Sequence, residues 1–383
     1  MSIFRNFAGT LALSLTLSAA GLVGVAQSSP ASALPSTTLS PPVGGQQLAA
    51  AGVIVNLRPG VPAPPAMPGA SFLLADMDTG QILVARAPHV PHLPASTLKT
   101  LTALTLIPVL DPQTKILVTP QDLNVDGTHV GLMPGTSYSV STLLQGLLLA
   151  SGNDAAFALA RGNHSVAATL QAMNATAADL GASDTVAKDP SGLDKAGQQT
   201  SAYDLALIGR AAMRLPDFRR YVSTRWITFP GGRSSAGKMM PAFAVGNHNK
   251  LIHNYPGAIG VKNGYTTAAK FTYIEAATRG GKTYLVTEMS SPRGDWQPTA
   301  ALLNWAFAHG SKVTPIGVLV EPGEDPVVKP TAPPVLRPLA LTTPPTESAL
   351  SAGLPEWISA AVMLAGLILA ISWARRRTTR GRS

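Results

Sequence analysis

The pattern of apolar and polar residues in the middle of the chain predicts strands, then helices, then strands again. Residues 71–76 and 81–85 have strand composition and flank the turn residues 78–80, which is a hairpin pattern. Apolar residues then recur at helical spacing, and strand-like runs return at 271–277 and 282–289. Strands at both ends with helices between them predict an α/β domain whose terminal strands share one sheet. The helices are expected at 98–105, 141–149, 153–160, 166–180, 203–213 and 298–309.

The first 33 residues have the pattern of a secretory signal peptide. Arg5 supplies the positive charge, residues 7–25 are apolar, and small residues offer a cleavage site near Ala26 or after residues 31–33. An uncleaved leader that stays in the membrane is the alternative.

Residues 354–374 have the length and composition of a single transmembrane helix. Trp357 and Trp373 lie near its ends, where aromatic side chains suit the membrane interfaces. Five arginines follow within residues 375–383, a stop-transfer pattern that predicts a basic cytoplasmic tail. The segment is apolar all round, which argues against a helix lying on the membrane surface. We therefore expect a single-pass protein of the cell membrane whose body lies outside the cytoplasm, on the cell-wall side.

Two proline-rich stretches separate these ends from the body. Residues 34–67 are predicted to be a linker, and residues 312–353 a tether between the body and the membrane. The body, residues 68–311, is long enough for a single domain.

Composition narrows the chemistry that the body can perform. Of 383 residues, 45% are hydrophobic, which excludes wholesale disorder. There is no cysteine, so disulfides, thiolate metal sites and a cysteine nucleophile are excluded. The net charge of +9 comes largely from six arginines in the two ends, without which 23 basic residues face 20 acidic ones. A nucleic-acid partner is therefore not expected.

Three short motifs stand in order along the body. They are Ser96-Thr97-Leu98-Lys99, Ser151-Gly152-Asn153 and Lys262-Asn263-Gly264. This combination is typical of active-site serine β-lactamases and penicillin-binding proteins. Ser235 and Lys238 also fit the first pattern, but they lie in a glycine-rich stretch with no helical continuation, which indicates a loop.

The residue types suit nucleophilic catalysis by a serine. Ser96 and Lys99 lie one turn apart on a predicted helix, so the amine is expected to reach the hydroxyl and to act as its general base. That requires a neutral lysine, which burial and the second cation of Lys262 both favour. Ser151 can relay a proton, and Asn153 can position the lysine and a substrate amide. The backbone N–H groups of Ser96 and Tyr265 are the candidate oxyanion hole.

At these residues the chain resembles the serine-type D-alanyl-D-alanine carboxypeptidases, the low-molecular-weight penicillin-binding proteins. The resemblance extends to 141–147, 189–194, 201–206 and 247–251. It implies a penicillin-binding-protein and β-lactamase-like fold, with an antiparallel sheet and helices on both sides. It further implies removal of the terminal D-alanine from peptidoglycan stem peptides through an acyl-enzyme on Ser96, and inhibition by β-lactams. No cofactor is expected.

Two features of the site differ from the family pattern or extend beyond it. The family's third motif usually reads Lys-Thr-Gly, whereas this chain has Asn263 in the middle position, which bears on contacts with the substrate carboxylate. The resemblance also implies a basic residue soon after this motif that holds the same carboxylate. Arg293 is the candidate.

Three alternative functions remain at this stage. A β-lactamase would share the nucleophile, but no glutamate lies between Ser151 and Lys262 to activate a deacylating water. A catalytically inactive peptidoglycan-binding protein is kept open by Asn263. A zinc enzyme is disfavoured because the spaced pairs His89/His92 and His248/His253 lack the glutamate of the usual zinc motif.

Overall fold

The computed structural model describes residues 42–234 and 236–323. The strands are β1 (Val53–Leu57), β2 (Ser71–Asp76), β3 (Gln81–Arg86), β4 (Lys115–Leu117), β5 (Ser137–Ser139), β6 (Trp226–Phe229), β7 (Phe243–Gly246), β8 (Ala258–Thr266), β9 (Lys270–Arg279), β10 (Lys282–Ser291), β11 (Val313–Thr314) and β12 (Gly317–Val318). The α-helices are α1 (Lys99–Leu106), α2 (Pro120–Leu123), α3 (Val140–Leu148), α4 (Asn153–Gly162), α5 (Val166–Asp179), α6 (Ala202–Ala212), α7 (Pro216–Val222), α8 (Lys250–Asn254) and α9 (Gln297–His309). Three short 3₁₀ helices are η1 (Gln46–Ala49), η2 (Ala95–Leu98) and η3 (Gly310–Lys312).

The main sheet of the described residues joins the two ends of the domain. Its strand order is β11-β1-β3-β2-β10-β9-β8, with β12 also paired to β3, and every pairing is antiparallel. Strand β2 is buried along its whole length because it lies between β3 and β10. The prediction that strands from the start and the end of the body share one sheet is therefore confirmed.

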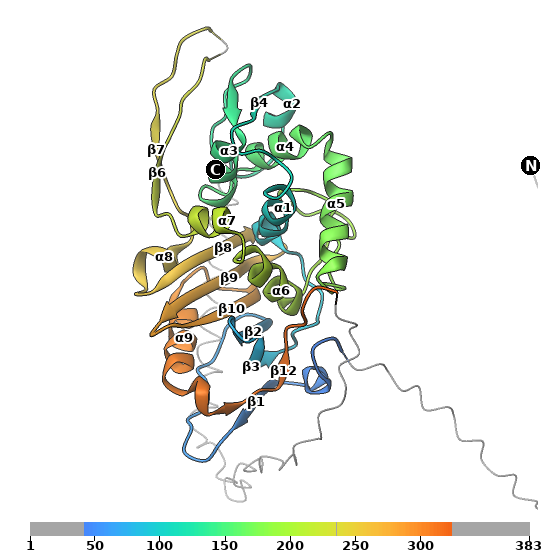
Figure 1. Cartoon of the computed structure of the whole chain (residues 1–383), viewed down its shortest axis with the longest axis vertical. Helices are drawn as coiled ribbons and strands as arrows, with labels where there is room; N and C mark the ends of the chain where they lie inside the picture. Colours follow the sequence, from blue (N-terminus) through green and yellow to red (C-terminus); the bar gives the residue numbers. More distant parts are fainter. Residues whose placement is uncertain (1–41, 235, 324–383) are drawn as a thin grey trace, which may run out of the picture. The chain divides into compact units, whose positions relative to one another are not determined.

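Helices cover both faces of this sheet, as expected (Figure 1). Side chains of β2 alternate between the faces, so Leu73 and Ala75 belong to the larger apolar cluster with α1, α3, α4 and α6. Phe72 and Leu74 face the opposite way and share a smaller cluster with Leu303 of α9. Strand β2 thus contributes side chains to both apolar clusters, one on each face of the sheet.

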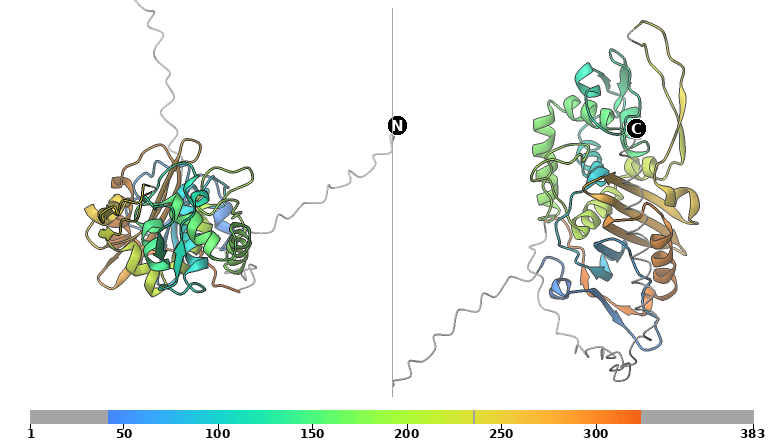
Figure 2. Two further views of the ribbon diagram at one scale, coloured as in Figure 1. Left: turned by 90° about the horizontal axis from the view of Figure 1, so that it is seen from above. Right: turned by 180° about the vertical axis from the view of Figure 1, so that it is seen from behind.

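The helical part of the domain carries two short two-stranded sheets, β4–β5 and β6–β7. The β6–β7 pair belongs to a long arm that stands beside the helices (Figures 1 and 2). Phe229 anchors the arm, because it is buried against the ring of Tyr138 and lies close to Gly146 of α3. The sequence interpretation placed a loop in this region and did not anticipate the strands.

The predicted boundaries of the body were too narrow on both sides. Strand β1 lies within the predicted linker 34–67, and β11 and β12 lie within the predicted tether 312–353. These strands are two to five residues long, too short to show a period. They form by pairing at the edge of the sheet: β1 and β12 pair with β3 on the side away from β2, and β11 pairs with β1. Proline content alone therefore misidentified folded chain as linker.

The predicted signal peptide, transmembrane helix and basic tail lie outside the described residues. Among residues 42–234 and 236–323, none of the helices combines the length and the apolar composition that a membrane crossing requires.

Candidate active site

Ser96 and Lys99 lie where η2 passes into α1. Pro94 precedes η2, and the apolar residues that follow bury α1 along its whole length. Ser96 is partly exposed while Lys99 is fully buried, so the pair spans the boundary between solvent and core. The Lys99 Nζ lies 2.8 Å from the Ser96 Oγ, which confirms the expected contact between the two side chains.

The Lys99 amine makes two further hydrogen bonds inside the domain. It donates to the Asn153 Oδ1 at 2.7 Å and to the backbone carbonyl of Ser191 at 2.6 Å. The amine is thus held by three acceptors and directed at the serine. Its position is set by the packing of three segments that are far apart in the sequence.

The protonation of Lys99 is shifted towards the neutral form. Burial is the main reason that the pKa of Lys99 lies well below its usual value, and the charge of Lys262 lowers it further. Asp189 and Asp154 act in the opposite direction. Burial also lowers the pKa of Lys262 to about 7. Two amines therefore share one buried region, and their mutual repulsion favours a neutral Lys99.

Strand β8 brings the third motif against the serine. Gly264 lies so close to η2 that a Cβ there would come within 2.6 Å of the Ser96 N, so only glycine allows this approach. Lys262 on the same strand is buried, and its Nζ donates to the Asn263 carbonyl at 2.7 Å. Tyr265 follows with an exposed side chain. The side-chain Oδ1 of Asn263 is buried and has no hydrogen-bond partner among the described residues.

The second motif lies at the start of α4. Ser151 is buried and has a φ of +61°, a left-handed conformation that is uncommon for serine. Asn153 is held at both ends: its N–H donates to the Thr128 carbonyl at 2.7 Å, and its Nδ2 donates to the Asp126 carbonyl at 2.6 Å. The loop 126–128 therefore orients the amide whose oxygen accepts from Lys99.

Two buried aspartates that the sequence analysis did not single out shape the walls of the site. Asp154 accepts the N–H groups of Val130, Gly131 and Leu132 at 2.9–3.0 Å. Asp189 accepts N–H groups from its own loop, including that of Ser191, whose carbonyl contacts Lys99. Asp154 directly follows the second motif and Asp189 begins the segment 189–194, but the N–H groups that they bind cannot be identified from residue patterns.

His248 is a third side chain near the site that the sequence analysis left without a role. Its backbone N–H donates to the Leu149 carbonyl at 2.9 Å, two residues before Ser151. Its pKa is lowered, first by burial and then by the charge of Lys262, which places the imidazole within electrostatic reach of that amine.

Arg293 is not joined to the motifs by any contact seen in the described part of the chain. It lies after β10 with its side chain largely exposed, and its guanidinium pairs with Asp295 at 2.7 Å. Its backbone carbonyl accepts from Tyr273 and Ser291. The structure therefore fixes the backbone of Arg293, and its contact with a substrate carboxylate stays a prediction.

His89 and His92, the first histidine pair considered for zinc, have other partners. His89 contacts Asp184 at 2.9 Å and the Val43 carbonyl at 3.0 Å, and the His92 Nε2 contacts the Ser71 Oγ at 2.7 Å. Within residues 42–234 and 236–323, we find no cluster of three or more side chains suited to a metal ion.

Comparison with known proteins places this geometry in a family. The sequence model of the peptidase family described as D-alanyl-D-alanine carboxypeptidase matches residues 60–291. The chain belongs to this family. It is a serine-type carboxypeptidase, a hydrolase with D-alanyl-D-alanine carboxypeptidase activity at the family level.

Individual relatives agree with the family assignment. The chain is 39% identical to the D-alanyl-D-alanine carboxypeptidase DacB2 of Mycobacterium tuberculosis, over 63% of this chain and 83% of that protein. It is 29% identical to DacA of Escherichia coli K12, over 71% of this chain and 69% of that protein.

Solved structures support the fold. The crystal structure of a D-alanyl-D-alanine carboxypeptidase from M. tuberculosis H37Rv superposes with a TM-score of 0.64 at 38% identity, covering 69% of this chain and 99% of that one. The Streptomyces K15 DD-transpeptidase gives 0.61 at 28% identity, covering 64% and 100%. The expected penicillin-binding-protein-like fold, an antiparallel sheet with helices on both sides, is confirmed.

Proposed function

We propose that this carboxypeptidase removes the terminal D-alanine from peptidoglycan stem pentapeptides through an acyl-enzyme on Ser96, and that β-lactams acylate the same residue. The observation that carries the proposal is the buried Lys99 amine, 2.8 Å from the Ser96 Oγ and close enough to the Lys262 amine for repulsion to lower its pKa. A buried lysine that is neutral near pH 7 is able to take the proton of a serine hydroxyl.

Acylation begins with proton transfer from the Ser96 Oγ to Lys99. The Oγ then bonds to the carbonyl carbon of the penultimate D-alanine, and the carbonyl oxygen becomes an oxyanion. The backbone N–H groups of Ser96 and Tyr265 are the proposed donors to that oxyanion, and removing one such donor typically costs about 3–4 kcal/mol in activation free energy. The peptide C–N bond breaks as the departing D-alanine amine receives a proton, for which Ser151 is the proposed relay. Water then hydrolyses the ester and restores Ser96.

The carboxylate of the substrate is proposed to lie near Lys262 and Asn263. Lys262 supplies positive charge from a buried position, because its side chain is almost fully shielded from solvent. The Asn263 side chain takes the place of the family's usual threonine and offers an amide N–H₂ that can donate to a carboxylate. Arg293 is proposed as a further carboxylate contact that exchanges its Asp295 partner for the substrate.

Labelling with a fluorescent penicillin tests the role of Ser96. We expect the wild type to label covalently and to release D-alanine from a synthetic pentapeptide, and Ser96→Ala to do neither, because the variant lacks the nucleophile. Ser235→Ala, which changes the serine of the other Ser-x-x-Lys sequence, is the matched control and should behave as the wild type. Labelling of Ser96→Ala would show that another residue is the nucleophile.

The same two assays of the wild type also test the alternative functions. Rapid penicillin turnover without D-alanine release would identify a β-lactamase, and a wild type inert in both assays would identify a binding protein.

We also propose export of the body and anchoring by the helix predicted at 354–374. The apolar length of that segment and the arginines that follow it support this location. Deleting residues 354–383 is expected to release active enzyme into the medium. Enzyme that stays with the membrane after this deletion would instead indicate anchoring by the leader.

A further inference from the structure

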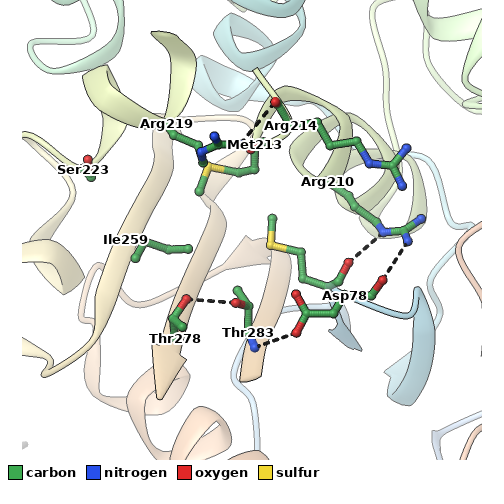
Figure 3. Close-up of a pocket in the computed structure, with 10 residues that line it drawn as sticks. Asp78, Arg210, Met213, Arg214, Arg219, Ser223, Ile259, Thr278 and Thr283 are labelled. Atoms are coloured by element: carbon green, nitrogen blue, oxygen red, sulfur yellow. Dashed lines mark hydrogen bonds between the residues drawn. The ribbon is translucent and has the colours of Figure 1, made fainter. Parts of the chain in front are cut away.

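A cavity of about 490 Å³ lies at the end of the main sheet, and none of the three motifs contributes to its walls (Figure 3). Its walls come from the turn after β2, the end of α6 and the residues that follow it, the middle and C-terminal end of α7, and the ends of β8, β9 and β10 that lie on this side of the sheet. The lining residues are Met77, Asp78, Arg210, Met213, Arg214, Arg219, Ser223, Ile259, Thr278 and Thr283. A cavity of this volume is within the range of small-molecule sites.

Positive charge predominates in the lining, with three arginines and one aspartate. Arg210 is buried and each of its three nitrogens donates a hydrogen bond: Nε to the Met77 carbonyl at 2.9 Å, Nη1 to Glu321 at 2.6 Å and Nη2 to the Asp78 carbonyl at 3.4 Å. Arg214 also pairs with Glu321. The carboxylate of Asp78 accepts the N–H of Thr283 at 3.1 Å. Arg210, Arg214 and Asp78 therefore already have hydrogen-bond partners within the protein.

Arg219 differs from the other two arginines because it has no acidic partner among the described residues. Its Nη1 donates to the carbonyls of Met213 and Arg214, at 2.8 and 3.2 Å, at the C-terminal end of α6. These two bonds fix one side of the guanidinium plane. Its Nε and Nη2 make no bond to the described part of the protein. Arg219 is an exposed residue, so these donors are open to solvent. A guanidinium that is held on one side and open to solvent on the other is suited to bind a carboxylate or a phosphate.

The remainder of the cavity is partly apolar. Met213 and Ile259 border it near Arg219, and Figure 3 shows Asp78 on the side away from Arg219 and Ser223. Thr278 and Thr283 form part of the wall and bond to each other at 2.9 Å. An anion at Arg219 is therefore separated from the Asp78 carboxylate and has apolar surface beside it.

We propose that this cavity binds an organic anion, a carboxylate or phosphate carried on a short apolar chain. The anionic group binds the free donors of Arg219, and the apolar chain packs against Met213 and Ile259. The site is separate from Ser96, so the proposal does not depend on the acyl-enzyme mechanism. Phosphorylated and carboxylated compounds of the cell envelope share this chemistry, and the test distinguishes the two.

The test is calorimetric titration of the full chain in nanodiscs with hexyl phosphate, hexanoate and inorganic phosphate. We expect saturable binding of at least one hexyl compound to the wild type, and weaker binding of inorganic phosphate because it lacks the apolar chain. The stronger of the two hexyl ligands identifies the anionic group as phosphate or carboxylate.

Variants localise the binding to the cavity. Arg219→Gln and Ser223→Glu should each weaken it at least tenfold, the first by removing the donor and the second by adding a negative charge. Arg220→Gln is the matched control, because Arg220 is adjacent in sequence but pairs with Asp217 outside the cavity. Thermal melting checks that each variant is folded. The proposal is overturned by absence of saturable binding, by equal affinity in Ser223→Glu and the wild type, or by equal loss in Arg220→Gln.

Discussion

At the scale of single residues, the proposed mechanism places opposite requirements on the two buried amines of Lys99 and Lys262. Lys99 must be neutral to accept the proton of Ser96, and its pKa is lowered by burial and by Lys262. Lys262 must be charged to attract a carboxylate, and burial lowers its pKa to about 7. The productive form is therefore the one in which Lys99 has lost its proton and Lys262 has kept it.

A bell-shaped pH profile of kcat/KM follows from these requirements. The rate should rise as Lys99 loses its proton, and it should fall above about pH 7 as Lys262 loses its own. Lys262→Arg should remove the fall on the alkaline side, because a guanidinium stays charged throughout this range. The measurement is the pH dependence of D-alanine release for both proteins. An unchanged alkaline limb in the variant would assign that limb to another group.

At the scale of elements, the start of α4 and the loop 126–132 act as one unit. The Asp154 carboxylate accepts three N–H groups from residues 130–132, and the same loop carries the Asp126 carbonyl that holds Asn153. This arrangement connects the stability of the loop to the position of the amide that contacts Lys99.

Asp154→Asn tests that connection. Asparagine retains one acceptor oxygen but loses the charge, so the free energy of unfolding should fall by about 1–3 kcal/mol. Penicillin labelling should slow at least tenfold because Asn153 loses its support. Urea unfolding and labelling rates measure the two effects. Asp179→Asn, at the exposed end of α5, is the control and should change neither. If the Asp154→Asn variant is destabilised but labels at the normal rate, the stability of the loop does not control the position of Asn153.

The packing of α9 on the sheet contains a buried glutamate. Glu275 of β9 is buried, its Oε2 has no hydrogen-bond partner among the described residues, and Thr299 of α9 bonds to its side chain. Burial is the main reason that its pKa is raised to about 8. The folded protein therefore holds a proton that the unfolded chain releases above about pH 4.5, so this group destabilises the fold increasingly from pH 4.5 to pH 8.

Glu275→Gln should remove that pH dependence. Relative to the wild type, the variant should gain about 1–3 kcal/mol in the free energy of unfolding between pH 5 and pH 8, because glutamine does not ionise. Urea unfolding at the two pH values measures the change. A difference between variant and wild type that is the same at both values would show that Glu275 does not titrate in this range.

At the scale of the whole molecule, the domain is closed by segments beyond the predicted body. Strand β11 pairs with β1, and β12 pairs with β3. This segment also buries four apolar side chains, those of Val313, Ile316, Leu319 and Val320. Each such side chain contributes about 1.5–3 kcal/mol when it is fully buried. Residues 312–320 therefore belong to the folded enzyme.

Two truncated chains test whether the folded domain ends after β12 or at the predicted boundary, residue 311. A chain ending at residue 323 keeps both strands and should melt cooperatively. A chain ending at residue 311 loses them, exposes the edge of β1, and should melt at least several degrees lower or aggregate. Circular dichroism melting and the soluble fraction measure the outcome. Equal melting temperatures would mean that the two strands add nothing to the fold.

The amino-acid sequence alone was enough to predict the family, the contact between Ser96 and Lys99 and the order of the long elements. Those features depend on local spacing: Ser96 and Lys99 are three residues apart, and the strands 71–76 and 282–289 are long enough to show composition and period. Segments such as 166–180 and 203–213 form helices close to the predicted bounds for the same reason.

Which distant groups meet became visible only in the folded structure. The Ser191 carbonyl at Lys99, the Asp154 bonds to 130–132 and the pairing of β1 with β11 join segments up to about 250 residues apart in the sequence. Such contacts depend on backbone N–H and C=O groups, which every residue except proline carries in the same form, so residue identity does not reveal them. Likewise, Arg210 and Arg214 pair with Glu321 whereas Arg219 does not, because Arg219 lies on α7 and bonds to the carbonyls at the end of α6. Neither composition nor sequence spacing distinguishes these three arginines.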